Sequence, residues 1–188
     1  MAQKMTVKEI SQRLLAGPDV VILDSETTDL RGRFVQIGIL ALDGTVLLDT
    51  LVNPLCAISR DAQAIHGITA EQVADAPTFA ELEPRLRELL HNKDVVIYNV
   101  QFDRNVLCGE LERLYRREDD FRAAWEQAAA WIAACRWHCA MELYSEHVGE
   151  WSNYHGSYRW QRLPGGDHSA IGDARATLAV LKEMVNEA

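Results

Sequence analysis

Long hydrophobic runs are absent from this sequence. No apolar stretch approaches the roughly 18 residues that a membrane-spanning helix needs. We therefore expect neither a membrane-spanning helix nor a membrane partner. Residues 1–6 carry no apolar stretch behind their charge, so we expect no signal peptide. Cysteine is also scarce, and Cys56, Cys108, Cys135 and Cys139 follow no disulfide framework. We therefore expect reduced thiols in a cytoplasmic protein.

Basic side chains are outnumbered. The 188 residues hold 19 Lys and Arg against 28 Asp and Glu, a formal net charge of −9. This charge argues against tight, non-specific binding to duplex nucleic acid. Nucleic acid is not excluded as a ligand, because metal ions bound by clustered carboxylates reverse the local sign of the charge.

The rest of the composition is that of an ordinary globular protein, with 48% hydrophobic and 25% charged residues. A chain of this length forms a single domain, residues 1–188, with a sizeable core. A capping box at Thr6–Glu9 predicts a short helix over residues 7–16. An alanine-rich stretch predicts a helical insertion at about residues 119–135.

Short apolar runs alternate with helical patterns along the chain. The expected strands are residues 20–23, 34–42, 45–52 and 95–98, with a hairpin turn at Asp43-Gly44. Capping boxes begin helices after Thr69 and Thr78, and Ser169 caps a final helix. Residues 145–167 have few aliphatic side chains and are expected to be mostly loop. This order predicts an α/β layer fold with a mixed sheet.

Two acidic residues follow the first buried strand. Strand side chains alternate between faces, so Asp24 and Glu26 point the same way. Their charges repel each other, and a divalent cation between them relieves that repulsion. Taken alone, such a pair is more often a solvated surface feature.

Three further polar residues lie where the chain enters helices. Asp103 follows the strand at 95–98, His168 lies just before the final helix, and Asp173 lies within that helix. Each has an ordinary explanation by itself. Asp103 suits the first turn of a helix, His168 a solvated loop, and Asp173 an exposed helix surface.

In this order, the five residues resemble the motifs of the DEDDh 3′-to-5′ exonucleases. This superfamily includes the bacterial DNA polymerase III proofreading subunits, RNase T and oligoribonuclease. Asp24 and Glu26 match the first motif, Asp103 the second, and His168 with Asp173 the third. Residues 64–69 (AIHGIT) resemble a further segment of these enzymes, and the resemblance spans about residues 20–181.

The resemblance implies an RNase H-like fold, with a five-stranded mixed sheet flanked by helices. It also implies hydrolysis of phosphodiester bonds with two Mg²⁺ or Mn²⁺ ions per site. The implied metal ligands are Asp24, Glu26, Asp103 and Asp173. His168 takes the proton of the attacking water, a task suited to a group that titrates near neutrality.

The resemblance also suggests residues that hold the 3′-terminal nucleotide. Thr27 and Thr28 contact its sugar, and Leu30 wedges against its base. His66, Asn99 and Phe102 are further substrate candidates. As an isolated loop histidine, His66 suits a local hydrogen-bonding role equally well, and Phe102 suits the core equally well. The chain departs from the family pattern at two positions. Asp29 replaces the usual glycine, and Tyr98 replaces a frequent histidine.

Two clusters near the C-terminal half have competing interpretations. Trp151, Tyr154, Tyr158 and Trp160 are interleaved with Arg159 and Arg162, which is typical of a single-strand groove but also of a loop packed on the sheet edge. Cys135, His138 and Cys139 invite zinc binding. Their irregular spacing without a fourth ligand argues against zinc, and the nearby Trp131, Trp137 and Met141 are expected in the core.

The leading hypothesis is a metal-dependent 3′–5′ exonuclease. Its substrates are 3′ ends of single-stranded or frayed nucleic acid, DNA before RNA, and it releases nucleoside 5′-monophosphates. The alternatives are a short-RNA exoribonuclease and a non-catalytic nucleic-acid-binding module associated with a polymerase. A polymerase or repair partner and a homodimer are both compatible with this sequence.

Overall fold

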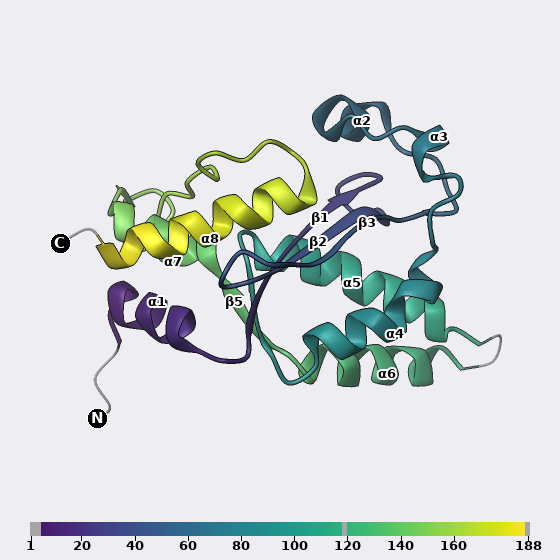
Figure 1. The fold of residues 1–188 in the computed structure, drawn as a ribbon, viewed down its shortest axis with the longest axis horizontal. Helices are drawn as coiled ribbons and strands as arrows, with labels where there is room; N and C mark the ends of the chain where they lie inside the picture. Colours follow the sequence, from purple (N-terminus) through teal and green to yellow (C-terminus); the bar gives the residue numbers. More distant parts are fainter. Residues whose placement is uncertain (1–4, 118–119, 187–188) are drawn as a thin grey trace.

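The structure, a computed structural model, describes residues 5–117 and 120–186 (Figure 1). A five-stranded sheet lies at its centre, in the order β3-β2-β1-β4-β5. The strands are β1 (Val20–Thr27), β2 (Phe34–Ala41), β3 (Val46–Leu51), β4 (Asp94–Ile97) and β5 (Arg136–Cys139). β2 is antiparallel to β1 and β3, whereas β4 is parallel to β1 and β5. The predicted five-stranded mixed sheet is confirmed.

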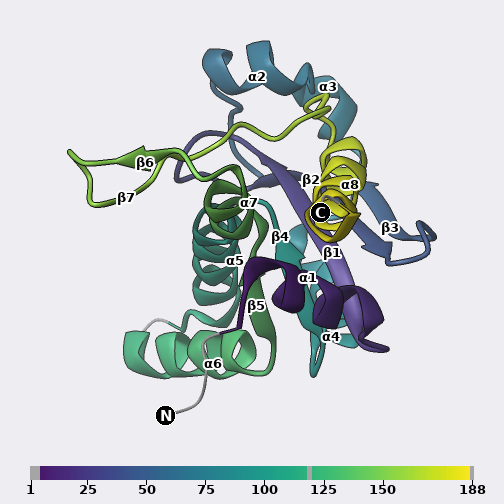
Figure 2. The ribbon, with the colours of Figure 1, turned by 90° about the vertical axis from the view of Figure 1, so that its left-hand side faces the viewer.

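Helices cover both faces of the sheet (Figures 1 and 2). Val21 and Leu23 of β1 face a core formed with α4 (Phe79–Leu90), α5 (Val100–Tyr115) and α6 (Phe121–Ala133). Val20 and Ile22 face the opposite core, formed with α1 (Val7–Ala16), α7 (Ala140–Val148) and α8 (Ala170–Asn186). Because side chains alternate along a strand, this pattern assigns a face to every later residue of β1.

Several local predictions are confirmed. The capping box of Thr6 and Glu9 begins α1. The turn between β2 and β3 contains Gly44 at φ +90°, a conformation that glycine adopts without strain. α4 begins after Thr78 and continues through Pro84. The hydroxyl of Ser169 accepts the backbone N–H of Gly172 at 3.1 Å and so caps α8.

Other elements differ from the predictions. β5 was not predicted, and neither was α2 (Arg60–His66), which buries no side chain and therefore shows no apolar stripe. The predicted loop 145–167 contains the end of α7 and a hairpin of β6 (Trp151–Ser152) and β7 (Ser157–Tyr158). A short helix, α3 (Ala70–Val73), follows Thr69 as expected.

The predicted helical insertion corresponds to α6, which packs beside α5. Residue 119, its predicted start, lies outside the described residues. Within the described ranges, no helix is both long and apolar enough to cross a membrane.

Candidate active site

The central strand β1 carries the first two acidic residues of the site. Asp24 pairs with Gly38 across β2, and Glu26 pairs with Gln36. Both carboxylates are partly exposed and share the sheet face that α8 covers, as the alternation along β1 requires. The site is therefore built on the central strand of the sheet, which is paired with β2 on one side and β4 on the other.

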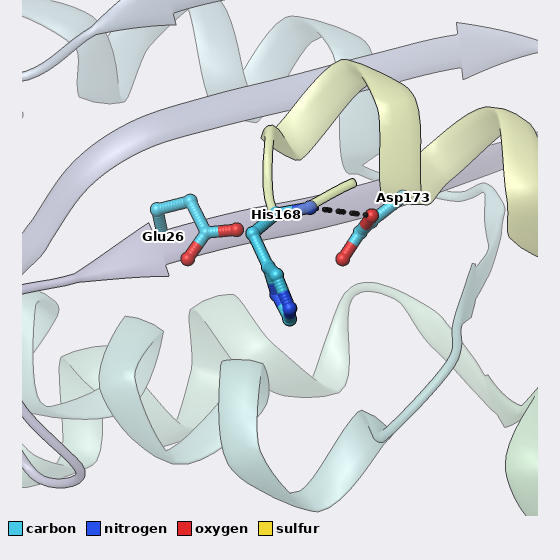
Figure 3. A group of neighbouring side chains, drawn as sticks. All are labelled: Glu26, His168 and Asp173. Carbon is cyan, nitrogen blue, oxygen red and sulfur yellow. Dashed lines mark hydrogen bonds between the residues drawn. The ribbon is translucent and has the colours of Figure 1, made fainter. Parts of the chain in front are cut away.

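The start of α8 brings the third motif to these carboxylates. Asp173 lies in the first turn of α8, and His168 lies in the exposed loop before it. Ligand atoms of Glu26, His168 and Asp173 all lie within 4.8 Å of one another. Figure 3 shows these three side chains grouped at the start of α8. One oxygen of Asp173 accepts the backbone N–H groups of Asp167 at 2.8 Å and His168 at 3.2 Å. These bonds tie the loop to the helix.

Asp103 approaches from the opposite face of the sheet. It lies in the first turn of α5 and is only 4% exposed. The hydroxyl of Ser25, which points away from its neighbours Asp24 and Glu26, donates a 2.5 Å hydrogen bond to Asp103. Ser25 thus holds the second-motif carboxylate against the same stretch of β1.

The carboxylates perturb one another strongly. Burial, then repulsion by Asp173 and Asp103, raises the pKa of Glu26 to about 8. Burial followed by repulsion from Asp103, Asp173 and Glu26 raises the pKa of Asp24 well above its usual range. Burial raises the pKa of Asp103 to about 7, although its hydrogen bond from Ser25 opposes the shift. These groups form one electrostatic unit.

The donor set fits divalent cations. Carboxylate oxygens are the ligands that Mg²⁺ and Mn²⁺ prefer, and positive charge would cancel the repulsion that raises these pKa values. Of the described residues, Glu26, His168 and Asp173 are the group whose ligand atoms converge closely enough to hold an ion. The structure therefore contains an acidic candidate metal site.

Stability should depend on pH and on metal together. Glu26 titrates near 4.5 when unfolded and near 8 when folded, so between these values the folded chain retains a proton that the unfolded chain loses. The free energy of unfolding therefore falls as pH rises through this window. We expect the melting temperature in chelator to fall from pH 5 to pH 8, and Mg²⁺ or Mn²⁺ to restore more of it at pH 8. Thermal melts at both pH values test this, and a metal effect equal at both would contradict it.

Gly38 allows α8 to approach the sheet opposite Asp24. A Cβ atom at position 38 would lie 2.7 Å from the carbonyl carbon of Ala170 and 2.8 Å from the backbone nitrogen of Ile171. The side-chain oxygen of Gln36 accepts the N–H of Ala170 at 3.1 Å. β2 thus positions the helix that carries Asp173, although β2 supplies no site carboxylate.

Gly38→Ala should impair both stability and turnover. The added methyl group must displace the start of α8, and overpacking of this kind costs about 1–3 kcal/mol. Displacing Asp173 by an ångström should reduce kcat by roughly 100-fold. Denaturant unfolding and steady-state kinetics measure the two effects. The control is Gly109→Ala in α5, where the nearest atom would lie 3.5 Å away. Wild-type kinetics in Gly38→Ala would contradict the positioning role.

The residues after β1 form a compact turn. The hydroxyl of Thr27 donates to the carbonyl of Asp29 at 2.8 Å, and that of Thr28 accepts the N–H of Arg33 at 3.0 Å. Both threonines are buried, whereas Leu30 is 84% exposed at the tip. This turn presents Leu30 to solvent, and the predicted substrate contacts of all three residues stay predictions.

His66 lies against the end of β1. It is the last residue of α2, not an isolated loop residue as expected. Its Nδ1 accepts the N–H of Ile68 at 3.0 Å, so Nε2 carries the hydrogen that it donates to the carbonyl of Thr27 at 3.2 Å. Burial lowers the pKa of His66. The imidazole links α2 to the site strand.

The remaining substrate candidates lie around the start of α5. Asn99 is exposed at the residue before α5. Phe102 packs against the core, and it also lines a cavity of about 410 Å³ together with Leu30. Its position is therefore compatible with both the core role and the substrate role. Arg159 and Arg162 are exposed and lie in the segment that leads to His168. Contact of these residues with substrate stays a prediction.

The residues considered for zinc have other partners. His138 contacts Asp94 at 2.7 Å, and the thiol of Cys139 donates to the carbonyl of Tyr98 at 3.3 Å. Cys135 is buried in the core, as are Trp131 and Met141. Trp137 is partly buried and packs against the same core as Trp131, so the core positions expected for the tryptophans fit the structure.

Some positioning residues were absent from the sequence-based site. Ser25, Gln36 and Gly38 were not selected. The signal for Gly38 was a glycine inside an apolar strand, which often marks close approach of another backbone. Asp167 was also missed. Its carboxylate accepts both the N–H and the hydroxyl of Ser169, at 3.0 and 2.7 Å, and orders the loop beside His168.

The sheet order and the flanking helices are those of an RNase H-like fold. The chain belongs to the exonuclease family, because residues 21–181 match the sequence profile described as Exonuclease. It is 32% identical over 179 residues to the uncharacterized exonuclease CP81 of Escherichia phage 186, with 88% of each chain covered. DNA polymerase III subunit epsilon of Rickettsia felis is 34% identical over 106 residues, which cover 52% of this chain and 46% of that subunit.

Solved structures agree with this assignment. Exonuclease X in complex with 5′ overhanging duplex DNA is 27% identical, with a TM-score of 0.56 over 89% of this chain and 91% of that one. E. coli Exonuclease I in complex with a dA16 oligonucleotide is 16% identical, with a TM-score of 0.62 over 89% of this chain and 42% of that one. The second likeness concerns the fold alone. The family and the fold are thus established from sequence and from structure.

Proposed function

We propose that this protein is a metal-dependent 3′–5′ exonuclease that removes nucleoside 5′-monophosphates from single-stranded or frayed DNA ends. The observation that carries the proposal is the convergence of Glu26, His168 and Asp173, electrostatically coupled to Asp24 and Asp103, in a chain of the exonuclease family. Mutually repelling carboxylates beside an exposed histidine suit phosphodiester hydrolysis better than a purely structural role.

The roles follow from the placement of the side chains. Asp24, Glu26, Asp103 and Asp173 would hold two Mg²⁺ or Mn²⁺ ions, which when bound stabilise charge on the attacking and leaving oxygens. His168 is exposed beside this cluster and would accept the proton of the attacking water. The bonds from the Asp167 and His168 backbone to Asp173 hold that imidazole near the carboxylates.

Selection of a terminal nucleotide is supported by the turn after β1. Leu30 protrudes from a turn in which the side chains of Thr27 and Thr28 are buried and hydrogen-bonded within the turn. An exposed leucine beside the site suits a wedge against the last base, and its pairing with Phe102 along one cavity suits a base held at the strand end. His66 supports the same turn through Thr27.

DNA is the proposed substrate because relatives named DNA polymerase III subunit epsilon are similar to about half of this chain, and Exonuclease X is solved with DNA. The epsilon relatives also make a polymerase a reasonable partner to test. Since this chain spans about half the length of those subunits, such a partner is part of the proposal.

The test is a gel time course with 5′-labelled DNA and RNA oligonucleotides, in Mg²⁺, Mn²⁺ or chelator. The expected result is a ladder that shortens from the 3′ end only with metal, faster on DNA. A reversed preference would favour the short-RNA exoribonuclease. Absence of cleavage by folded protein, with and without a candidate polymerase, would overturn the proposal in favour of a binding module.

A further inference from the structure

The β6–β7 hairpin projects away from the sheet and its helices, as Figure 2 shows. We call residues 151–162, which include this hairpin, the aromatic arm. The chain has five tryptophans and five tyrosines, and four of these side chains lie in the arm: Trp151, Tyr154, Tyr158 and Trp160. Residues 151–166 contain no Asp or Glu, although the whole chain carries 28. The arm thus carries positive charge, whereas the protein as a whole is negatively charged.

The arm exposes its aromatic rings. Tyr154 is 92% exposed and Trp160 is 76% exposed. Trp151 contacts Tyr158 edge to face, with 5.2 Å between ring centroids, so the hairpin has an ordered aromatic base. A groove of about 840 Å³ runs along the arm, lined by Ser152, Tyr154, His155, Ser157, Tyr158, Arg159 and Trp160. Exposed rings beside an arginine form a stacking surface that also attracts phosphate.

The arm is anchored at its C-terminal end to the core that α8 covers. The hydroxyl of Tyr98 donates a 2.9 Å hydrogen bond to the carbonyl of Gln161, and Leu163 packs against the core beneath α8. Burial raises the pKa of Tyr98 to about 12, so its hydroxyl keeps the proton that it donates. Only a few residues then separate this anchor from His168. Tyr98, a departure from the family pattern, therefore fastens the arm at its base.

We infer that the aromatic arm binds the single strand upstream of the 3′-terminal nucleotide. Bases stack on Tyr154 and Trp160, while Arg159 and Arg162 face the phosphates. This inference rests on the proposed function and adds a second contact region to the same substrate. Charge complementarity favours an anionic ligand, because a chain of net charge −9 repels phosphate except where its acidic residues are absent. The exposed rings of Tyr154 and Trp160 favour nucleic acid over an acidic protein surface, because bases stack on them.

The test compares a long and a minimal substrate. Tyr154→Ser with Trp160→Ser removes both exposed rings, and Trp125→Ser in α6, where Trp125 is 59% exposed, is the matched control. The substrates are a 5′-labelled dT12 and the p-nitrophenyl ester of thymidine 5′-monophosphate, which is too small to reach the arm. We expect the double variant to raise KM for dT12 about tenfold or more, leaving kcat and ester hydrolysis unchanged. The control should match the wild type.

Tyr98→Phe tests the anchor separately. The variant keeps the buried ring and removes only the bond to Gln161, so KM for dT12 should rise several-fold while ester hydrolysis stays at the wild-type level. If Tyr98→Phe impairs hydrolysis of dT12 and of the ester equally, Tyr98 supports the core and not the arm.

Other results would overturn the inference. An unchanged KM for dT12 in the double variant would exclude upstream contact. A changed sedimentation coefficient with unchanged KM would make the arm an interface between protein chains. If the wild type hydrolyses neither substrate, the proposed function fails, and fluorescence anisotropy with labelled dT12 still decides whether the arm binds a single strand.

Discussion

Asp24→Asn is expected to reduce kcat by at least about 1,000-fold while the protein stays folded. The substitution preserves the size of a side chain at the centre of β1 and removes the charge that interacts with three other carboxylates. Loss of a carboxylate that would hold the metal removes several kcal/mol of transition-state stabilisation, and each 1.36 kcal/mol corresponds to a factor of ten. Steady-state kinetics on a labelled single strand in Mg²⁺ measures the effect.

The same variant should gain stability without metal. Asp24 is held in a buried, like-charged cluster, so removal of its charge relieves repulsion at pH 8. We therefore expect a higher melting temperature than the wild type in chelator and a smaller increase on addition of Mn²⁺. Asp61→Asn, an exposed aspartate on α2, is the control and should change neither property. Wild-type turnover by Asp24→Asn would refute the proposed role of Asp24 as a metal ligand.

His168→Ala is expected to lower kcat by about 100- to 10,000-fold, the range of a general base. Because the carboxylates of β1, α5 and α8 remain, binding of Mn²⁺ should be kept. Kinetics and isothermal titration calorimetry with Mn²⁺ separate the two effects. Loss of Mn²⁺ binding together with activity would make His168 a ligand and not a base.

The backbone at His168 calls for a second variant. Its φ is +61°, in the left-handed region that alanine adopts less readily than asparagine. His168→Asn keeps the loop conformation better and removes the imidazole. If chemistry explains the loss, both variants should be equally inactive. Recovery of turnover in His168→Asn would instead point to the conformation of the loop.

The positions of the acidic residues on the sheet could be predicted from the sequence more completely than the elements around them. Asp24 and Glu26 follow a continuous apolar run, and strand alternation correctly placed them on one face. The capping signals at Thr6, Thr69 and Thr78 also correspond to helix starts, because caps are local interactions. The family motifs then supplied the pairing of distant segments that local patterns lack.

The missed elements lack a periodic apolar signal. β5 is four residues long, and its position depends on parallel pairing with β4 more than 40 residues away. The hairpin strands β6 and β7 have two residues each. The hydrogen bond between Ser25 and Asp103, and the contact of Gly38 with Ala170, join residues far apart in the chain. No window of sequence contains both partners.

The strand residues of the site and His168 lie in parts of the molecule that differ in their resistance to local unfolding. Asp24 and Glu26 lie in a strand with neighbours on both sides, where backbone hydrogen exchange is typically slowest. His168 lies in an exposed loop that follows the arm. On warming, His168 should lose its position before Asp24 and Glu26 lose theirs. Heat inactivation would then precede unfolding of the sheet and reverse on cooling.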